Sequence, residues 1–169
     1  MGLPGTDFPR IAGLPAGYIL RQLHDLGDSN RRDAPVMKTI VSAFSEEELQ
    51  AVANSVSQMP VSFTAKALTG AERPRTAGEA LALQGDWTRN IPACTACHGP
   101  DGVGVGEAFP ALQGQNAGYL SSQLSAWQRG ARKNDPNDLM GAVARSLSAA
   151  EIRSVSDYFA NLPLDGGRP

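Results

Sequence analysis

The chain has 169 residues, of which 41% are hydrophobic and 19% charged, a composition typical of one large or two small globular domains and not of a disordered chain. Its 15 Lys and Arg stand against 17 Asp and Glu, and this balance excludes an electrostatic binder of nucleic acid. No run approaches the roughly 18 apolar residues of a membrane span, and no signal-peptide pattern is visible at residues 1–7.

Two copies of one sequence pattern organise the chain. Shifted by 101 residues, positions 8–28 match the second copy at 8 of 21 positions, including the Phe-Pro, Ala-Gly-Tyr and Gln-Leu pairs. With two extra residues in the second copy, Met37 falls on Met140 and Pro60 falls on Pro163. Since order and spacing are both kept, the sequence predicts two related units in tandem.

The predicted elements are helices separated by short irregular stretches. Apolar residues recur at helical spacing, and no segment alternates as a strand does. In chain order, we expect helices over 16–27, after Ser45, over 77–84, over 117–130 and after Ser148.

Start and stop signals frame the last helix of each copy. Ser45 with Glu48, and Ser148 with Glu151, have the spacing of a capping box, in which each side chain bonds a free amide of the first turn. Pro60 and Pro163 are expected to end these helices. The sequence thus predicts an all-α fold with an incomplete unit over 1–60, a linker over 61–76 and a second unit over 77–169.

The chemistry lies in Cys94, Cys97 and His98, which include both cysteines of the chain. Their Cys-x-x-Cys-His spacing is typical of c-type haem attachment. Two thiols about one helical turn apart can form thioethers with the two vinyl groups on one porphyrin edge, and the next residue then directs an imidazole at the iron. The motif predicts one haem c, covalently bound.

Three other interpretations compete with haem. A structural zinc site needs four ligands, whereas the chain has two Cys and only His24 besides His98. A dithiol oxidoreductase places its Cys pair in a strand-helix-strand context that is absent here. A disulfide across two residues is sterically awkward and leaves His98 unexplained. The haem interpretation is therefore preferred.

The pattern as a whole resembles the class I c-type cytochromes, and the repeat makes it similar to their two-domain, two-haem bacterial members. The resemblance rests on residues 91–102 around the Cys pair, on 109–115, on the Ala-Gly-Tyr helix start at 117–119, on a later Met and on the last helix. It implies two cytochrome c-like helical domains in tandem, of which the first is incomplete.

The missing part of the first domain is a haem motif. Shifting His98 back by 101 residues gives a position upstream of Met1. We therefore expect that the complete protein is longer, that it carries a second haem, and that Met37 is an axial ligand of that haem.

The resemblance also implies the iron ligands. His98 is the proximal ligand, and Met140, in a loop-like stretch over 133–140, is the distal one; a gap-filling core role is the alternative for Met140. The backbone carbonyl of Pro110 is expected to accept a hydrogen bond from the other ring nitrogen of His98, whereas Pro110 in a simple turn is the alternative. A thioether ligand favours ferrous iron and raises the reduction potential.

Further residues receive structural expectations only. Glycines between the Cys motif and Pro110 are expected to let the backbone approach the haem closely: Gly99, Gly102, Gly104 and Gly106. The candidates for lining the pocket are Leu112, Tyr119, Trp127, Leu139 and Phe159. A basic group at the end of the helix over 117–130 is expected to form a solvated helix end, and contact with a haem propionate or an acidic partner is the alternative: Arg129, Arg132 and Lys133.

The function that follows is one-electron transport in a periplasmic respiratory chain, by a carrier that is not an enzyme. The expected partners are redox proteins such as a membrane oxidase, a reductase or a dehydrogenase, and not nucleic acid. Two alternatives stay open, a haem domain with an open iron position and an electron-entry subunit docked to a larger oxidoreductase. The periplasmic prediction follows from the place where bacteria attach haem c, since the chain itself shows no export signal.

Overall fold

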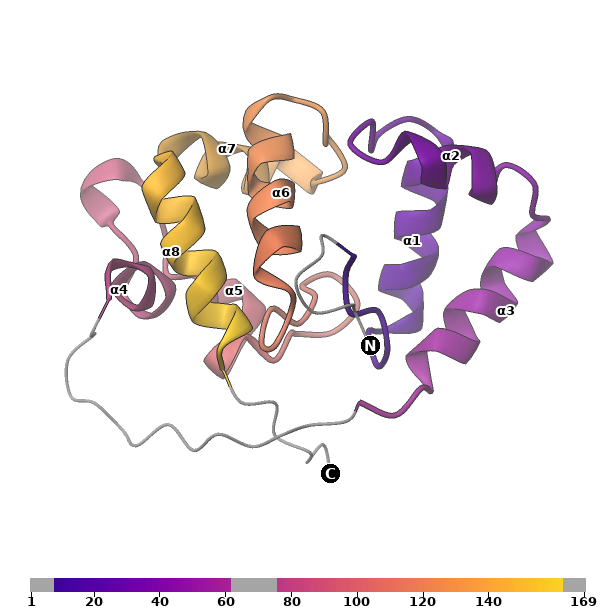
Figure 1. Cartoon of the computed structure of the whole chain (residues 1–169), viewed down its shortest axis with the longest axis horizontal. Coiled ribbons are helices and arrows are strands. Elements are labelled where there is room, and N and C mark those ends of the chain that lie inside the picture. The colour runs from indigo at the N-terminus through magenta and orange to yellow at the C-terminus, as the bar shows by residue number, and fades with distance from the viewer. Residues whose placement is uncertain (1–7, 62–75, 163–169) are drawn as a thin grey trace.

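The computed structural model describes residues 8–61 and 76–162, and within these residues the fold is all-helical with no strand. Figure 1 shows the helices of the two repeats gathered side by side, with α6 between α8 and the first repeat. The α-helices are α1 (Ala16–Gly27), α2 (Pro35–Val41), α3 (Glu46–Ser57), α4 (Ala77–Leu83), α5 (Cys94–His98), α6 (Ala117–Gln128), α7 (Leu139–Ser146) and α8 (Ala149–Ala160). Short 3₁₀ turns are η1 (Trp87–Arg89), η2 (Pro100–Gly102) and η3 (Pro136–Asp138).

The last helix of each repeat begins as the sequence predicts. Ser45 Oγ accepts from the Glu48 amide at 3.3 Å, and the Glu48 carboxylate accepts from the Ser45 amide at 2.8 Å. Ser148 and Glu151 form the same pair of bonds at the start of α8. These reciprocal bonds satisfy amides that a helix start leaves free, so both capping boxes are confirmed.

The prediction that Met140 lies in a loop is wrong, because Met140 is the second residue of α7. Its equivalent in the first repeat, Met37, lies in α2, a second helix that the sequence analysis did not predict. Both helices are short, with seven residues in α2 and eight in α7, and neither gives a long enough periodic signal. Their starts also lack a Ser, Thr or Asn side chain bonded to the first turn.

The second repeat is built on the close contact of α4 with α8. Gly78 donates its amide to Ser154 Oγ at 2.8 Å, and a Cβ at this glycine would overlap the backbone of Ser154 and Val155. This close approach buries the apolar side of α8 against α4. The buried apolar residues of this repeat include Leu81, Ala82, Ile91, Leu147, Ile152, Val155, Phe159 and Leu162.

The first repeat has a smaller core between α1, α2 and α3. Its buried residues are Leu14, Ile19, Leu26, Val41, Leu49, Ala53 and Val56. The predicted linker over 61–76 lies almost wholly outside the described residues, and the domain limits stay predictions. The expected second haem also stays a prediction.

The two repeats dock through a buried polar contact in which equivalent positions face each other. Arg31 and Arg132, which are 101 positions apart, form an antiparallel backbone bridge. Their guanidinium groups both donate to Gln123 Oε1 at 2.7 Å. The expectation of a solvated helix end is therefore wrong for Arg132, whose exposed fraction is only 5%, because this side chain is enclosed by the first repeat.

Candidate functional site

The two cysteines and the histidine of the motif share the short helix α5. Cys94 is half-buried beside the Leu81 carbonyl, its Sγ at 3.9 Å, whereas Cys97 is exposed, and neither thiol is in a disulfide. Because three positions separate the cysteines in a helix, both thiols lie on one side of α5. The helix ends at Gly99, whose φ of +79° few other residues tolerate.

The ionisation of Cys94 argues against a redox dithiol. Burial raises the pKa of the Cys94 thiol to about 11, so the thiolate that a disulfide oxidoreductase needs is disfavoured. Across the described residues, no three His, Cys, Asp or Glu side chains gather as a metal cluster either.

His98 is buried, and its ring orientation is fixed by one hydrogen bond. Nδ1 lies 2.8 Å from the carbonyl oxygen of Pro110, and since that oxygen can only accept, Nδ1 carries the proton. Burial lowers the pKa of His98, against the opposing effect of the Pro110 carbonyl, so the ring is neutral at pH 7. A neutral ring with its proton on Nδ1 leaves the lone pair of Nε2 for a metal, which is the state of an iron-ligating histidine.

The loop between His98 and Pro110 is held by its own backbone. The Gly104 amide donates to the His98 carbonyl at 2.7 Å. A Cβ at Gly102 would lie within 3 Å of the Phe159 ring, and one at Gly104 would meet the backbone of Phe109 and Ala111. These two glycines thus let the loop pack on α8 and on itself, and their expected role beside the haem stays a prediction.

Met140 lies in a different part of the second repeat from α5. It is half-buried in the first turn of α7, which packs on α6, whereas α5 packs on α4. The structure therefore brings Cys94, Cys97, His98 and Pro110 together directly, while Met140 comes from a separate element. Of the expected lining residues, Phe159 is buried and Leu139 is 54% exposed.

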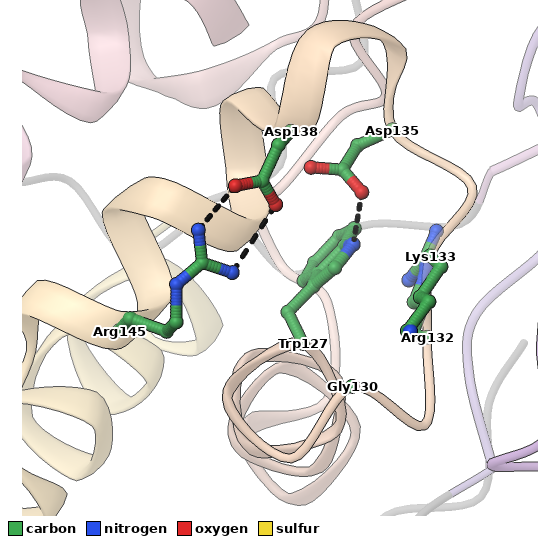
Figure 2. A pocket seen from close by; sticks show the side chains of 7 residues that line it. All are labelled: Trp127, Gly130, Arg132, Lys133, Asp135, Asp138 and Arg145. Atoms are coloured by element: carbon green, nitrogen blue, oxygen red, sulfur yellow. Dashed lines mark hydrogen bonds and ion pairs between the residues drawn. The ribbon is translucent and has the colours of Figure 1, made fainter.

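A polar pocket of about 350 Å³ adjoins the start of α7 (Figure 2). Asp138 and Arg145 form a bidentate ion pair on one side of it, and Trp127 donates Nε1 to Asp135 Oδ1 at 3.1 Å on the other. The sequence analysis missed this pocket, since its residues come from the end of α6, from the loop between α6 and η3, and from η3 and α7. It is lined by Trp127, Gly130, Arg132, Lys133, Asp135, Asp138 and Arg145.

The donor set of α5 fits haem c on the evidence of these contacts. Two free thiols lie one turn apart, and a neutral imidazole with an available Nε2 follows them. Within the described ranges 8–61 and 76–162, no helix has the length and apolar character needed to cross a bilayer.

Comparison with known families gives one match over the second repeat. The family model described as cytochrome c matches residues 76–163. This range contains α4–α8, with both cysteines, His98 and Met140.

Relatives of known name cover both repeats. A thiosulfate dehydrogenase electron acceptor from Stutzerimonas stutzeri (strain A1501) is 51% identical over 162 residues, which are 96% of this chain and 74% of that protein. The crystal structure of reduced cytochrome c4 from Pseudomonas stutzeri is 33% identical, with a TM-score of 0.76 over 92% of this chain and 85% of that one. A thiosulfate dehydrogenase structure from Marichromatium purpuratum is 38% identical, with a TM-score of 0.80 over 92% of this chain but only 33% of that chain.

Proposed function

The chain belongs to the cytochrome c family of haem c electron carriers, and we propose that Cys94 and Cys97 hold its haem while His98 and Met140 ligate the iron. The single observation that supports this best is the bond from His98 Nδ1 to the Pro110 carbonyl, because it leaves Nε2 as a ligand. Haem iron, when bound, supplies a one-electron couple between its ferric and ferrous states.

The residues of this chain would keep the haem attached and its ligands fixed during electron transfer. The two thioethers keep the cofactor attached through repeated cycles, and Pro110 fixes the proximal ring so that little rearrangement accompanies a change of charge. Met140 would supply a soft thioether ligand, which would raise the reduction potential. A haem held by both His98 and Met140 would have no open coordination position, which suits electron transfer and not oxygen or peroxide chemistry.

The Met140→Ala variant tests this ligation. We expect haem to stay attached, the reduction potential to fall, and the Met-to-iron charge-transfer band of the oxidised protein to disappear. Reduced wild-type protein should resist carbon monoxide, whereas the variant should bind it. An unchanged potential and a persisting band would assign the sixth position to another residue and would favour neither Met140 nor an open site.

We propose further that the physiological electron donor is a thiosulfate-oxidising dehydrogenase in the periplasm. Support comes from the relative from Stutzerimonas stutzeri, which is named for accepting electrons from thiosulfate dehydrogenase and aligns with nearly all of this chain. Rapid mixing of oxidised protein with such a dehydrogenase and thiosulfate tests this. We expect reduction of the haem within the enzyme's turnover time, and reduction no faster than with thiosulfate alone would contradict it.

One observation favours a second candidate, a subunit docked to the dehydrogenase. The chain matches 33% of the thiosulfate dehydrogenase chain from Marichromatium purpuratum, so a unit of this fold forms part of a larger polypeptide there. Co-purification of a dehydrogenase subunit with the native protein would favour docking over free diffusion. Fractionation of cells that express the complete native gene tests the periplasmic location.

A further inference from the structure

The segment that leads from α6 to Met140 is bonded to the first repeat through its backbone. The Lys133 amide donates to the Asn30 carbonyl at 2.8 Å, and the Ala131 carbonyl accepts from the Arg32 amide at 2.7 Å. These two bonds flank the Arg31–Arg132 bridge. Residues 131–133 of the second repeat are thus paired with residues 30–32 of the first.

Side chains of α1 hold the next residue of the same segment. Asn134 Nδ2 donates to Gln22 Oε1 at 2.9 Å and to Asp25 Oδ2 at 2.8 Å. Gln22 Oε1 also accepts from Arg132 at 2.9 Å. Because the donors belong to one repeat and the acceptors to the other, the position of Asn134 depends on how the repeats dock.

Arg132 connects the docked segment 131–134 to Trp127 in α6. Its buried guanidinium lies over the Trp127 ring, with Cζ 4.0 Å from the ring centroid. A cation–π contact is stronger at a desolvated site than at an exposed one. The contact fixes the tilt of the indole, and with it the direction of the Trp127 N–H.

The indole in turn determines where α7 begins (Figure 2). Trp127 Nε1 donates to one oxygen of Asp135 at 3.1 Å, and the other oxygen accepts from the Gly141 amide at 2.8 Å. Gly141 directly follows Met140 in the first turn of α7. Since the N-cap residue Asp138 makes no side-chain bond to this turn, Asp135 supplies an acceptor that the helix start needs.

The contacts from Arg132 through Trp127 to Asp135 form a relay, and the first repeat has no equivalent of it. The positions equivalent to Trp127 and Asp135 are Leu26 and Ala34, which have no polar side chain to offer. The start of α2 is formed by Pro35 instead, which has no amide to satisfy. The relay is therefore specific to the repeat that carries the Cys motif.

We propose that the first repeat positions Met140: docking of α1 on residues 131–134, relayed through Arg132, Trp127 and Asp135, holds the first turn of α7 in place for ligation. This inference rests on the proposed ligation of iron by Met140. Its consequence is that loosening the contact between the repeats would open the sixth coordination position, although both proposed iron ligands lie in the second repeat.

Imidazole binding to the oxidised, haem-loaded full chain tests the proposal, since imidazole competes with Met140 for the iron. Asp25→Ala removes an anchor in the first repeat, and Trp127→Phe keeps the ring under Arg132 but removes the N–H. We expect each to bind imidazole roughly fivefold more tightly, as for the loss of one partly buried hydrogen bond, with a weaker Met-to-iron band. Unfolding followed by far-UV circular dichroism reports whether each variant remains folded.

Glu107→Gln is the matched control, because it changes a contact between the repeats in which none of residues 131–135 takes part. The Glu107 carboxylate accepts from the Tyr18 amide at 3.1 Å. We expect imidazole binding to be unchanged in this variant. An equal increase in all three variants would mean general loosening and would overturn the proposal.

The Met140→Ala variant shows whether a negative result concerns the positioning role of the first repeat or the ligation of iron by Met140. If Met140→Ala binds imidazole far more tightly while Asp25→Ala and Trp127→Phe match wild type, the ligation stands and the positioning role is overturned. If Met140→Ala itself matches wild type, the ligation and the positioning role are both overturned. Should Trp127→Phe fail to fold, Asp25→Ala decides alone.

Discussion

The helices α3 and α8 start with the same capping box and occupy equivalent places in the two repeats, yet they are buried to very different extents. Val52 in α3 is 38% exposed, whereas its equivalent in α8, Val155, is 4% exposed. Met59 is 48% exposed, and its equivalent Leu162 only 5%. The difference arises because α4 packs on α8, whereas no described element covers the same side of α3.

The comparison shows that one helix pattern serves two environments. A capping box and a helical period decide that α3 and α8 form, but a neighbouring element decides whether their apolar side is buried. In the second repeat, that neighbour also brings the Cys motif, since α5 packs on α4. Stability and cofactor attachment are therefore coupled in the second repeat.

His98→Ala should have the largest effect. We expect haem attachment to fail and the second repeat to lose its cooperative unfolding, because the cofactor forms much of the core of so small a domain. Haem absorbance and far-UV circular dichroism measure the two losses. The control is His24→Ala, which removes the other histidine, an exposed residue that pairs with Glu46 in the first repeat. A stable, cooperatively unfolding second repeat without haem would contradict this prediction.

Truncating the two equivalent valines should have a smaller effect, and the loss of stability should differ between the repeats. Val155→Ala should lower the free energy of unfolding of the haem-loaded protein by roughly 2 kcal/mol, because it leaves a cavity in a packed core. Val52→Ala should lower it by less than about 0.5 kcal/mol, since an exposed side chain has little contact to lose. Denaturant unfolding measures both, and equal losses would show that the α3 side is covered in solution.

Acid should weaken the second repeat through Glu151. A hydrogen bond from Arg89 at 2.6 Å, with help from Ser148, lowers the pKa of Glu151 from 4.5 to about 2. A carboxyl with a depressed pKa stabilises the fold above its unfolded-state pKa, and this contribution is lost as the pH falls from 4.5 towards 2. The pair is exposed, so we expect a smaller effect than that of Val155→Ala.

Glu151→Gln isolates this contribution. The stability difference between wild type and the variant should be full at pH 6 and should vanish as the acid range is crossed, and Arg89→Gln should remove the same part of the pH dependence. Chemical unfolding at a series of pH values measures it. A difference that stays constant with pH would show that the ionisation of Glu151 does not contribute to stability.

The smallest effect concerns how the two equivalent helices α1 and α6 are capped. Asn116 caps α6 from within its own repeat, at 2.9 Å from the Gly118 amide, whereas α1 follows Pro15 and receives Glu107 from the other repeat. Glu107→Ala should lower the free energy of unfolding by about 0.5 kcal/mol, the low end for a lost cap. An effect as large as that of Val155→Ala would mean that Glu107 has a role beyond capping.

The sequence predicts the long helices well because their signals are local. The range 16–27 agrees with α1, and the two Ser–Glu pairs begin α3 and α8 where capping requires. The position of the acceptor for His98 was expected from the resemblance, and the bond to the Pro110 carbonyl is present.

The contact between the repeats could not be predicted from local patterns. Arg132 follows a helix, and the sequence predicts that it is exposed to solvent, since nothing nearby in the sequence indicates burial. The repeat offered one signal, because Arg31 and Arg132 occupy equivalent positions and residues at such positions often meet across a pseudo-symmetric interface. The burial of Arg132 depends on the docking of the two repeats, which a local stretch of sequence does not reveal.

The intact mass of the full chain, made in a host with haem-maturation machinery, tests the central claim most directly. The account predicts the mass of the polypeptide plus one haem, with the haem retained after denaturation and absent from a Cys94→Ala, Cys97→Ala double variant. A chain that carries no covalent haem, or one that keeps its haem in the double variant, would contradict it.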